Sequence, residues 1–147
     1  MSPRFSDLPR FLSPLGPTRT GFAAVQKTLA ALEADIRHRA LPASLAVRAV
    51  AEEVEDHAGM TPRVVEKTGE IVARLRSLVA IELMVAAQAL DLRSARLGAP
   101  MRKAYDMVRT AVPMLREDRV IGPDIERIAA LIDAGSLVRA VDVPRIS

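Results

Sequence analysis

Apolar residues recur at intervals of three and four between the prolines of this 147-residue chain, which is the spacing of one face of an α-helix. One such stripe covers residues 22–36 and is followed by the basic residues 37–39, which favour the C-terminal end of a helix. Two more stripes cover residues 101–115, with a bend expected at the internal proline, and residues 123–132, with Gly135 as the stop. No useful stretch alternates with the period of a β-strand, so we predict an all-α fold.

The longest stripe predicts one long helix over about residues 62–93. Thr61 is expected as the N-cap and Pro62 as the first helical residue, and no further proline occurs until Pro100. The helix carries an apolar residue every seven positions: Val64, Ile71, Leu78, Val85 and Leu92. At 1.5 Å per residue it spans about 48 Å, whereas a compact globule of this length has a radius of gyration of about 15 Å.

The same helix is apolar nearly all round between residues 78 and 89, a pattern typical of a helix buried on several sides. The remaining helices are too short to cover it. We therefore expect residues 1–147 to form a single elongated helical domain that partner chains complete, with residues 1–19 as an extended N-terminal segment.

Composition narrows the functional classes. The net charge is only +3 and aromatic residues make up 3% of the chain, so a basic, aromatic nucleic-acid surface is not expected. Cysteine is absent, which excludes a disulfide framework and a thiol nucleophile. Neither a signal peptide nor a membrane span is predicted, because the most apolar run, residues 78–90, is interrupted by Glu82 and Gln88. A cytoplasmic location is the simplest expectation.

The densest polar cluster, residues 52–57, reads Glu-Glu-Val-Glu-Asp-His. Its spacing matches no metal site, and the chain has neither a Gly-Xaa-Ser-Xaa-Gly nucleophile motif nor a glycine-rich phosphate loop. Local pattern alone therefore favours a solvated helix face just before the break at Gly59.

Several strings, in order and spacing, give the chain a resemblance to the C-terminal part of the histidine and phenylalanine ammonia-lyase family. They are Leu8-Pro9-Arg10-Phe11-Leu12, Gly21-Phe22-Ala23-Ala24-Val25-Gln26, Pro42-Ala43-Ser44, Glu55-Asp56-His57 with Met60, residues 78–93 reading LVAIELMVAAQALDLR, Asp118-Arg119, Pro123-Asp124-Ile125-Glu126 and Gly135-Ser136-Leu137. The resemblance covers about residues 5–140.

The resemblance implies an elongated helical lyase, usually tetrameric, whose active sites combine residues of more than one subunit. Such enzymes use a methylidene-imidazolone (MIO) electrophile, formed from an internal Ala-Ser-Gly, to eliminate ammonia from histidine, phenylalanine or tyrosine. This chain contains no Ala-Ser-Gly, because the nearest strings are 43–45 (Ala-Ser-Leu) and 134–136 (Ala-Gly-Ser). We therefore expect no cofactor-binding residue and no metal ligand in it, and a larger partner chain that carries the MIO.

Glu55 is the one position that the resemblance assigns to the active site, as a catalytic and substrate-binding carboxylate facing the electrophile and the substrate amine or imidazole. Asp56 and His57 match the same string as structural supports. Val54 stands where relatives have an amide, and Gly59 stands where they have serine. These departures leave the amino-acid substrate open, as well as the choice between lyase and aminomutase chemistry.

The resulting hypothesis is the small subunit of a split, heteromeric ammonia-lyase-like enzyme. Two alternatives remain open: a scaffold subunit of the same complex that has lost catalysis, and an independent helical interaction module.

Overall fold

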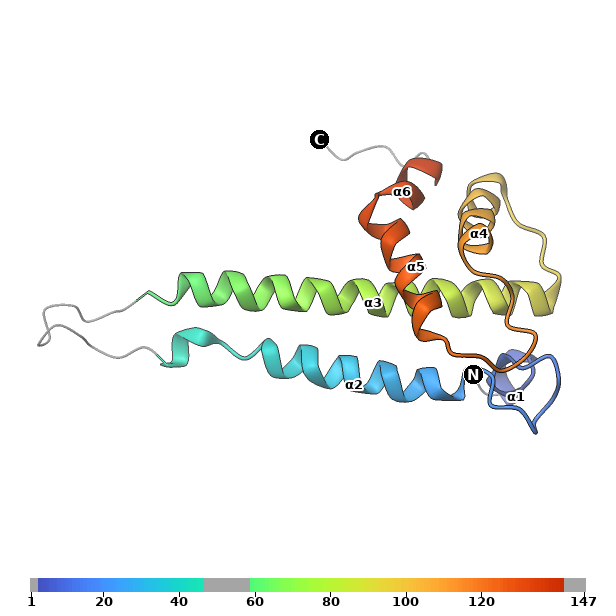
Figure 1. Ribbon diagram of the computed structural model, residues 1–147, viewed down its shortest axis with the longest axis horizontal. Helices are drawn as coiled ribbons and strands as arrows, with labels where there is room; N and C mark the ends of the chain where they lie inside the picture. The colour runs from blue at the N-terminus through green and yellow to red at the C-terminus, as the bar shows by residue number, and fades with distance from the viewer. Residues whose placement is uncertain (1–2, 47–58, 142–147) are drawn as a thin grey trace, which may run out of the picture.

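The computed structural model describes residues 3–46 and 59–141, and this part of the chain is helical without strands (Figure 1). The prediction of an all-α fold is confirmed. The elements in chain order are α1 (Pro3–Ser6), the 3-10 turn η1 (Arg10–Leu12), α2 (Ala23–Arg39), the 3-10 turn η2 (Ala43–Ala46), α3 (Thr61–Arg93), α4 (Ala99–Ala111), α5 (Gly122–Asp133) and α6 (Ser136–Val141).

Helix α3 is the predicted long helix and runs the length of the molecule. Its boundaries fall within one residue of the expected ones, with Pro62 in the first turn and Ser94 as a left-handed C-cap at φ 49°. The N-cap prediction is wrong, because Met60 occupies that position and Thr61 is already helical; no side chain caps this end.

Helix α2 lies antiparallel beside the middle part of α3, where Arg39 pairs with Glu70 and Asp35 pairs with Arg74, while α4, α5 and α6 gather around the C-terminal half of α3 (Figure 1). The core therefore lies at one end of the molecule. Its buried residues are Leu12, Phe22, Val25, Ala80, Ile81, Met84, Ala87, Val108, Val112, Leu115 and Ile128.

Two further expectations need correction. Helix α4 ends at Ala111 instead of bending and continuing to residue 115, because Pro113 disfavours the helical conformation at the residue before it and Val112 is extended at φ −139°. Residues 1–19 are not simply extended, since they contain α1 and η1. Gly135 does stop α5, at φ 63°, a conformation that glycine adopts without strain.

Gln88 ties three distant segments together at the centre of the core. Its side chain is fully buried, donates to the carbonyl oxygens of Leu12 (3.1 Å) and Leu115 (2.9 Å), and accepts from the backbone N–H of Leu115 (3.0 Å). The Asp118 carboxylate makes a similar connection outside the core, accepting from the backbone N–H groups of Thr20 (2.9 Å) and Gly21 (2.8 Å) just before α2. Side-chain to backbone bonds thus fix the loops around α3.

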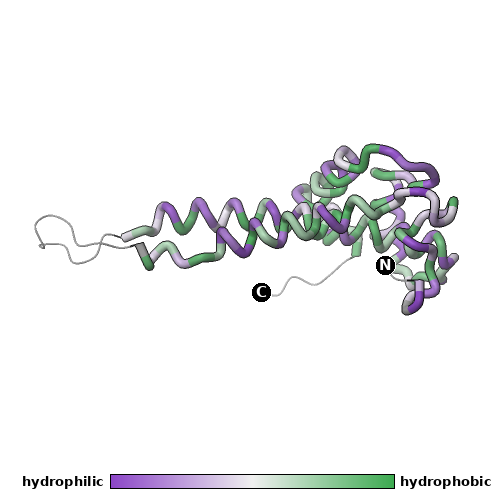
Figure 2. The backbone as a smooth tube through the Cα atoms, turned by 90° about the horizontal axis from the view of Figure 1, so that it is seen from below, coloured by the Kyte–Doolittle hydropathy of each residue, from purple (hydrophilic) through white to green (hydrophobic). Residues whose placement is uncertain are grey.

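The apolar surface of α3 is only partly covered by this chain. The hydropathy-coloured tube has apolar positions recurring along α3 into its N-terminal half, which α4–α6 do not reach (Figure 2). Val65, Val72, Leu75 and Val79 are exposed by 66%, 57%, 44% and 41%. Among the described helices, α3 included, none has a stretch long and apolar enough to cross a membrane.

Candidate functional site

The residues predicted for the active site, Glu55, Asp56 and His57, lie outside the described residues, as do Glu52 and Glu53. The structure does describe both flanks. The chain leaves α2 through Leu41 and η2 before this segment, and it resumes at Gly59 and Met60 before α3. Both flanks belong to the end of the α2–α3 hairpin that lies away from α4, α5 and α6 (Figure 1).

Four charged side chains lock the two helices in register near this end. On α2, Asp35 and Arg39 pair with each other, with Arg39 Nε 3.2 Å from Asp35 Oδ1. Across the interface Arg39 also pairs with Glu70 of α3, and Arg74 of α3 pairs with Asp35 and donates to the Glu70 carbonyl at 2.8 Å. Each cation thus contacts groups from both helices.

This ion-pair network affects the alignment of α2 and α3 more than it affects stability. The hydrogen bond from Arg74 lowers the pKa of Asp35 below its usual 3.8, aided by Arg39 and opposed by desolvation. Each of the four side chains is still 24 to 37% exposed, and ion pairs at such exposure add little to stability because solvent screens them. The network therefore sets which turn of α2 faces which turn of α3.

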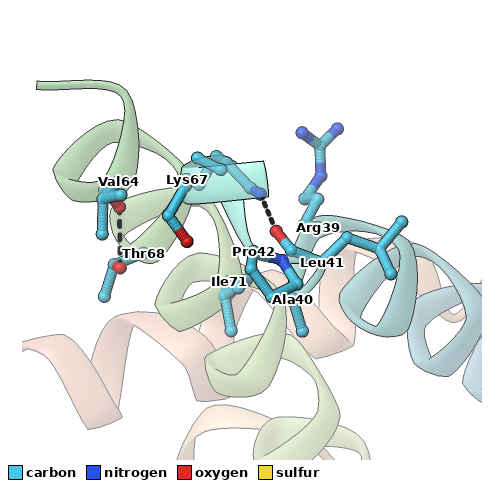
Figure 3. Close-up of a pocket in the computed structure, with 10 residues that line it drawn as sticks. Arg39, Ala40, Leu41, Pro42, Val64, Lys67, Thr68 and Ile71 are labelled. Atoms are coloured by element: carbon cyan, nitrogen blue, oxygen red, sulfur yellow. Dashed lines mark hydrogen bonds between the residues drawn. The ribbon is translucent and has the colours of Figure 1, made fainter. Parts of the chain in front are cut away.

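Lys67 fastens the chain just after α2 to α3. Its ammonium group donates to the carbonyl oxygen of Leu41, and the Thr68 hydroxyl donates to the Val64 carbonyl at 2.8 Å (Figure 3). These residues line a pocket of about 300 Å³, together with Arg39, Ala40, Pro42, Ala43, Ser44 and Ile71. The string Pro42-Ala43-Ser44, which carries part of the family resemblance, thus forms a wall of this pocket.

A second pocket, of about 360 Å³, brings the two flanks of the candidate segment together. It is lined by Pro42 and Ala43 from one flank and by Met60 from the other, with His38, Arg39, Leu41, Arg63 and Lys67. Arg63 is engaged with Glu66, the two side chains being 2.5 Å apart. The described rim therefore combines cationic and apolar side chains, and its cations Arg39, Arg63 and Lys67 are already engaged with groups of this chain.

The ion-pair network and the Lys67 contact were not predicted from the sequence. The spacing of Asp35 to Arg39 and of Glu70 to Arg74, four residues apart on their helices, could have indicated the intrahelical pairs. The cross-helix pairs depend on the register between α2 and α3, which the sequence does not specify. Within the described part of the chain, no group of three or more His, Cys, Asp or Glu residues could hold a metal ion.

Comparison with known proteins gives the chain its class. Residues 1–110 match the family described as "Aromatic amino acid lyase". The chain is 37% identical over 139 residues to the histidine ammonia-lyase of Deinococcus radiodurans, covering 95% of this chain and 26% of that enzyme. The chain belongs to the aromatic amino acid lyase family.

Solved structures agree with this assignment. The crystal structure of histidine ammonia-lyase from Trypanosoma cruzi superposes with a TM-score of 0.91 at 34% identity, over 98% of this chain and 29% of that one. The tyrosine aminomutase of Streptomyces globisporus superposes with a TM-score of 0.85 at 30% identity, over 93% and 27%. The chain thus spans little more than a quarter of the length of the relatives it matches.

Proposed function

We propose that this chain is the small subunit of a heteromeric ammonia-lyase-like enzyme that eliminates ammonia from an aromatic or related amino acid, or shifts its amine. The observation that carries the lyase part of the proposal is the superposition of 98% of this chain on the histidine ammonia-lyase of Trypanosoma cruzi, with a TM-score of 0.91 at 34% identity. The similarity to both a lyase and an aminomutase keeps the two outcomes for the amine within the proposal.

The electrophile of the proposed reaction comes from elsewhere. The residues of this chain do not fit it: no Ala-Ser-Gly is present, and Ala43-Ser44-Leu45 ends in a leucine that is 83% exposed. The MIO forms from Ala-Ser-Gly, and leucine stands where that sequence requires glycine. We infer that a larger partner chain with an Ala-Ser-Gly carries the MIO, in a hetero-oligomer arranged like the tetramers of the family.

Glu55 is the residue of this chain that we assign to the shared active site. A carboxylate in a desolvated pocket attracts the ammonium group of an amino-acid substrate and can accept a proton from it. Asp56 and His57 support the position of Glu55. At the hairpin end described above, ion pairs and the Lys67 contact hold the end of α2 and Leu41 against α3, which brings together the two helices that precede and follow this segment.

The test is reconstitution. The chain is purified through an affinity tag from its own host, the proteins that bind it are identified, and each is expressed with it and without it. Ammonia release from histidine, phenylalanine and tyrosine is then measured, together with the ultraviolet absorbance of the electrophile. We expect activity and absorbance only when the chain is combined with a polypeptide that carries Ala-Ser-Gly.

Ammonia release by the chain alone would contradict the proposal, as would the recovery of a complex without any Ala-Ser-Gly polypeptide. One observation favours a scaffold role as the second candidate, since Val54 removes an amide beside the assigned carboxylate. If substitution of Glu55 leaves the turnover of the reconstituted enzyme unchanged, the scaffold role is favoured.

A further inference from the structure

A pocket of about 280 Å³ lies where α3 ends and the chain turns into α4, at the other end of α3 from the candidate site (Figure 1). This volume is just below the range of about 300 to 1,000 Å³ of sites for drug-sized ligands, so it suits a smaller molecule. Its lining combines charged, hydroxyl-bearing and apolar side chains, among them Leu90, Asp91, Ser94, Leu97, Arg102 and Tyr105.

The ring of Tyr105 forms a fixed wall of this pocket. Its hydroxyl donates to Asp91, and the Asp91 carboxylate also pairs with Arg109 at 2.5 Å. The side chains of Asp91 and Arg109 are only 12% and 14% exposed, so their opposite charges offset each other within the chain. The tyrosine ring therefore stands as an aromatic surface beside a carboxylate that is already satisfied.

Arg102 brings an uncommitted cation to the rim. Its guanidinium group lies over the Tyr105 ring, 5.4 Å from the centroid, and makes no hydrogen bond to the part of the chain that the structure describes. The Asp106 carboxylate is 3.8 Å away, but both side chains are more than half exposed, so solvent screens this pair. The donors of Arg102 are therefore free to bind an anion in the pocket.

The charge of the surrounding segment also favours an anion. Residues 92–105 contain the four cations Arg93, Arg96, Arg102 and Lys103 and no carboxylate. A pocket bordered by charges of one sign raises the local concentration of ligands of the opposite sign.

Ser94 provides a second polar group and an independent sign of a ligand contact. It caps α3 in the left-handed region at φ 49°, where glycine is the usual residue and serine is strained. The Ser94 hydroxyl lines the pocket without a hydrogen-bond partner in residues 3–46 and 59–141. Strained residues concentrate at functional sites, and here the strain keeps an unpaired hydroxyl in the wall of a cavity.

We propose that this pocket binds a small aromatic carboxylate. The carboxylate group accepts hydrogen bonds from Arg102, whose planar fork of donors matches its two oxygens, and from the Ser94 hydroxyl. The ring of the ligand packs against the Tyr105 ring in an edge-to-face or offset arrangement and against Leu90 and Leu97. The inference does not rest on the proposed function, because every residue that it uses lies at the other end of α3 from Met60.

The first test compares three compounds by isothermal titration calorimetry on the full chain, or on the complex in which the chain is recovered. The probe is 3-phenylpropionate. Its amide, 3-phenylpropionamide, keeps the ring without the charge, and inorganic phosphate carries charge without a ring. We expect 3-phenylpropionate to bind about 10-fold or more tightly than either of the others. The absence of binding, or equal binding of the amide or of phosphate, would overturn the proposal.

The second test locates the binding with matched variants. Arg102→Gln should weaken the binding of 3-phenylpropionate by about 10-fold or more. Arg96→Gln is the control, because it removes the same charge from the same segment at an exposed position outside the pocket lining, and it should change the affinity by less than about twofold. Equal affinities of these two variants would refute the assigned site.

Ser94→Gly separates binding from folding. Glycine relieves the left-handed strain, so the free energy of unfolding should stay equal or rise, while loss of the hydroxyl should weaken binding by about threefold or more. Circular dichroism establishes that all three variants fold. A Ser94→Gly variant that binds as tightly as the original chain would contradict the role given to the hydroxyl. An active reconstituted lyase whose small chain shows no Arg102-dependent binding would refute this inference and leave the proposed function standing.

Discussion

Replacing Gln88 by leucine should destabilise the fold well beyond the effect of an ordinary surface substitution. Gln88 is fully buried and makes three hydrogen bonds to the backbone of Leu12 and Leu115. Leucine has nearly the same size but neither donates nor accepts, so these backbone groups lose their partner inside the core. Leu12 is particularly sensitive, because its φ of 54° lies in the left-handed region that leucine rarely adopts.

The magnitude follows from the number of bonds. Three buried hydrogen bonds at about 1 to 1.5 kcal/mol each amount to about 4 kcal/mol. The apolar surface of the leucine offsets about 1 to 2 kcal/mol of this. We expect a net loss of about 2 to 3 kcal/mol in the free energy of unfolding, which lowers the melting temperature by about 6 to 9 °C at about 3 °C per kcal/mol.

Urea unfolding followed by circular dichroism at 222 nm measures this loss. Protein concentration must be held constant, because self-association would add to the apparent stability. Gln26→Leu is the matched control, since Gln26 is exposed on α2 and the same substitution there should change stability by less than about 0.5 kcal/mol. A loss below about 1 kcal/mol for Gln88→Leu would refute the role assigned to this side chain.

Two further predictions concern the dependence of stability on pH. Hydrogen bonds from the backbone N–H groups of Thr20 and Gly21 lower the pKa of Asp118 below 3.8, so its stabilising effect is complete above that pH and is lost as the pH falls through the folded-state pKa. In Asp118→Asn, unfolding free energy measured between pH 5 and pH 2 should therefore vary less with pH. The Tyr105 hydroxyl donates to Asp91, which raises the pKa of Tyr105 above 10, so this stabilising effect is lost as the pH rises through the folded-state value. Spectrophotometric titration should place the ionisation of Tyr105 above pH 10, and a midpoint at or below pH 10 would contradict its hydrogen bond to Asp91. In Tyr105→Phe, the free energy of unfolding should fall less steeply at alkaline pH.

The sequence predicted the elements better than the contacts between them. Periodicity located α3 to within a residue because proline, glycine and the apolar stripe act locally. The same reading treated Gln88 and Glu82 alike, as interruptions of an apolar run, although Gln88 is fully buried and Glu82 is exposed. The partners of Gln88 are 27 and 76 residues away, and no local pattern specifies them.

The candidate site divides in the same way. The family resemblance placed a candidate active site at Glu55-Asp56-His57, and the roles of these three residues stay predictions. The pocket on its flanks depends on how α2 and α3 align, through Lys67 with Leu41 and Arg39 with Glu70. Those pairs join residues 26 and 31 positions apart, so they could be found only in three dimensions.

The most direct measurement of the central claim is turnover of the reconstituted enzyme with Glu55→Gln, compared with Glu52→Gln and Glu53→Gln. Glutamine preserves the shape of glutamate and removes its charge, so Glu55→Gln should reduce turnover by about 10²- to 10⁴-fold, the range of a positioned acid–base or electrostatic group. The two neighbouring variants should lose far less, and gel filtration must establish that all three assemble. If all three variants assemble and turn over equally, Glu55 is not a catalytic residue and the chain acts as a scaffold.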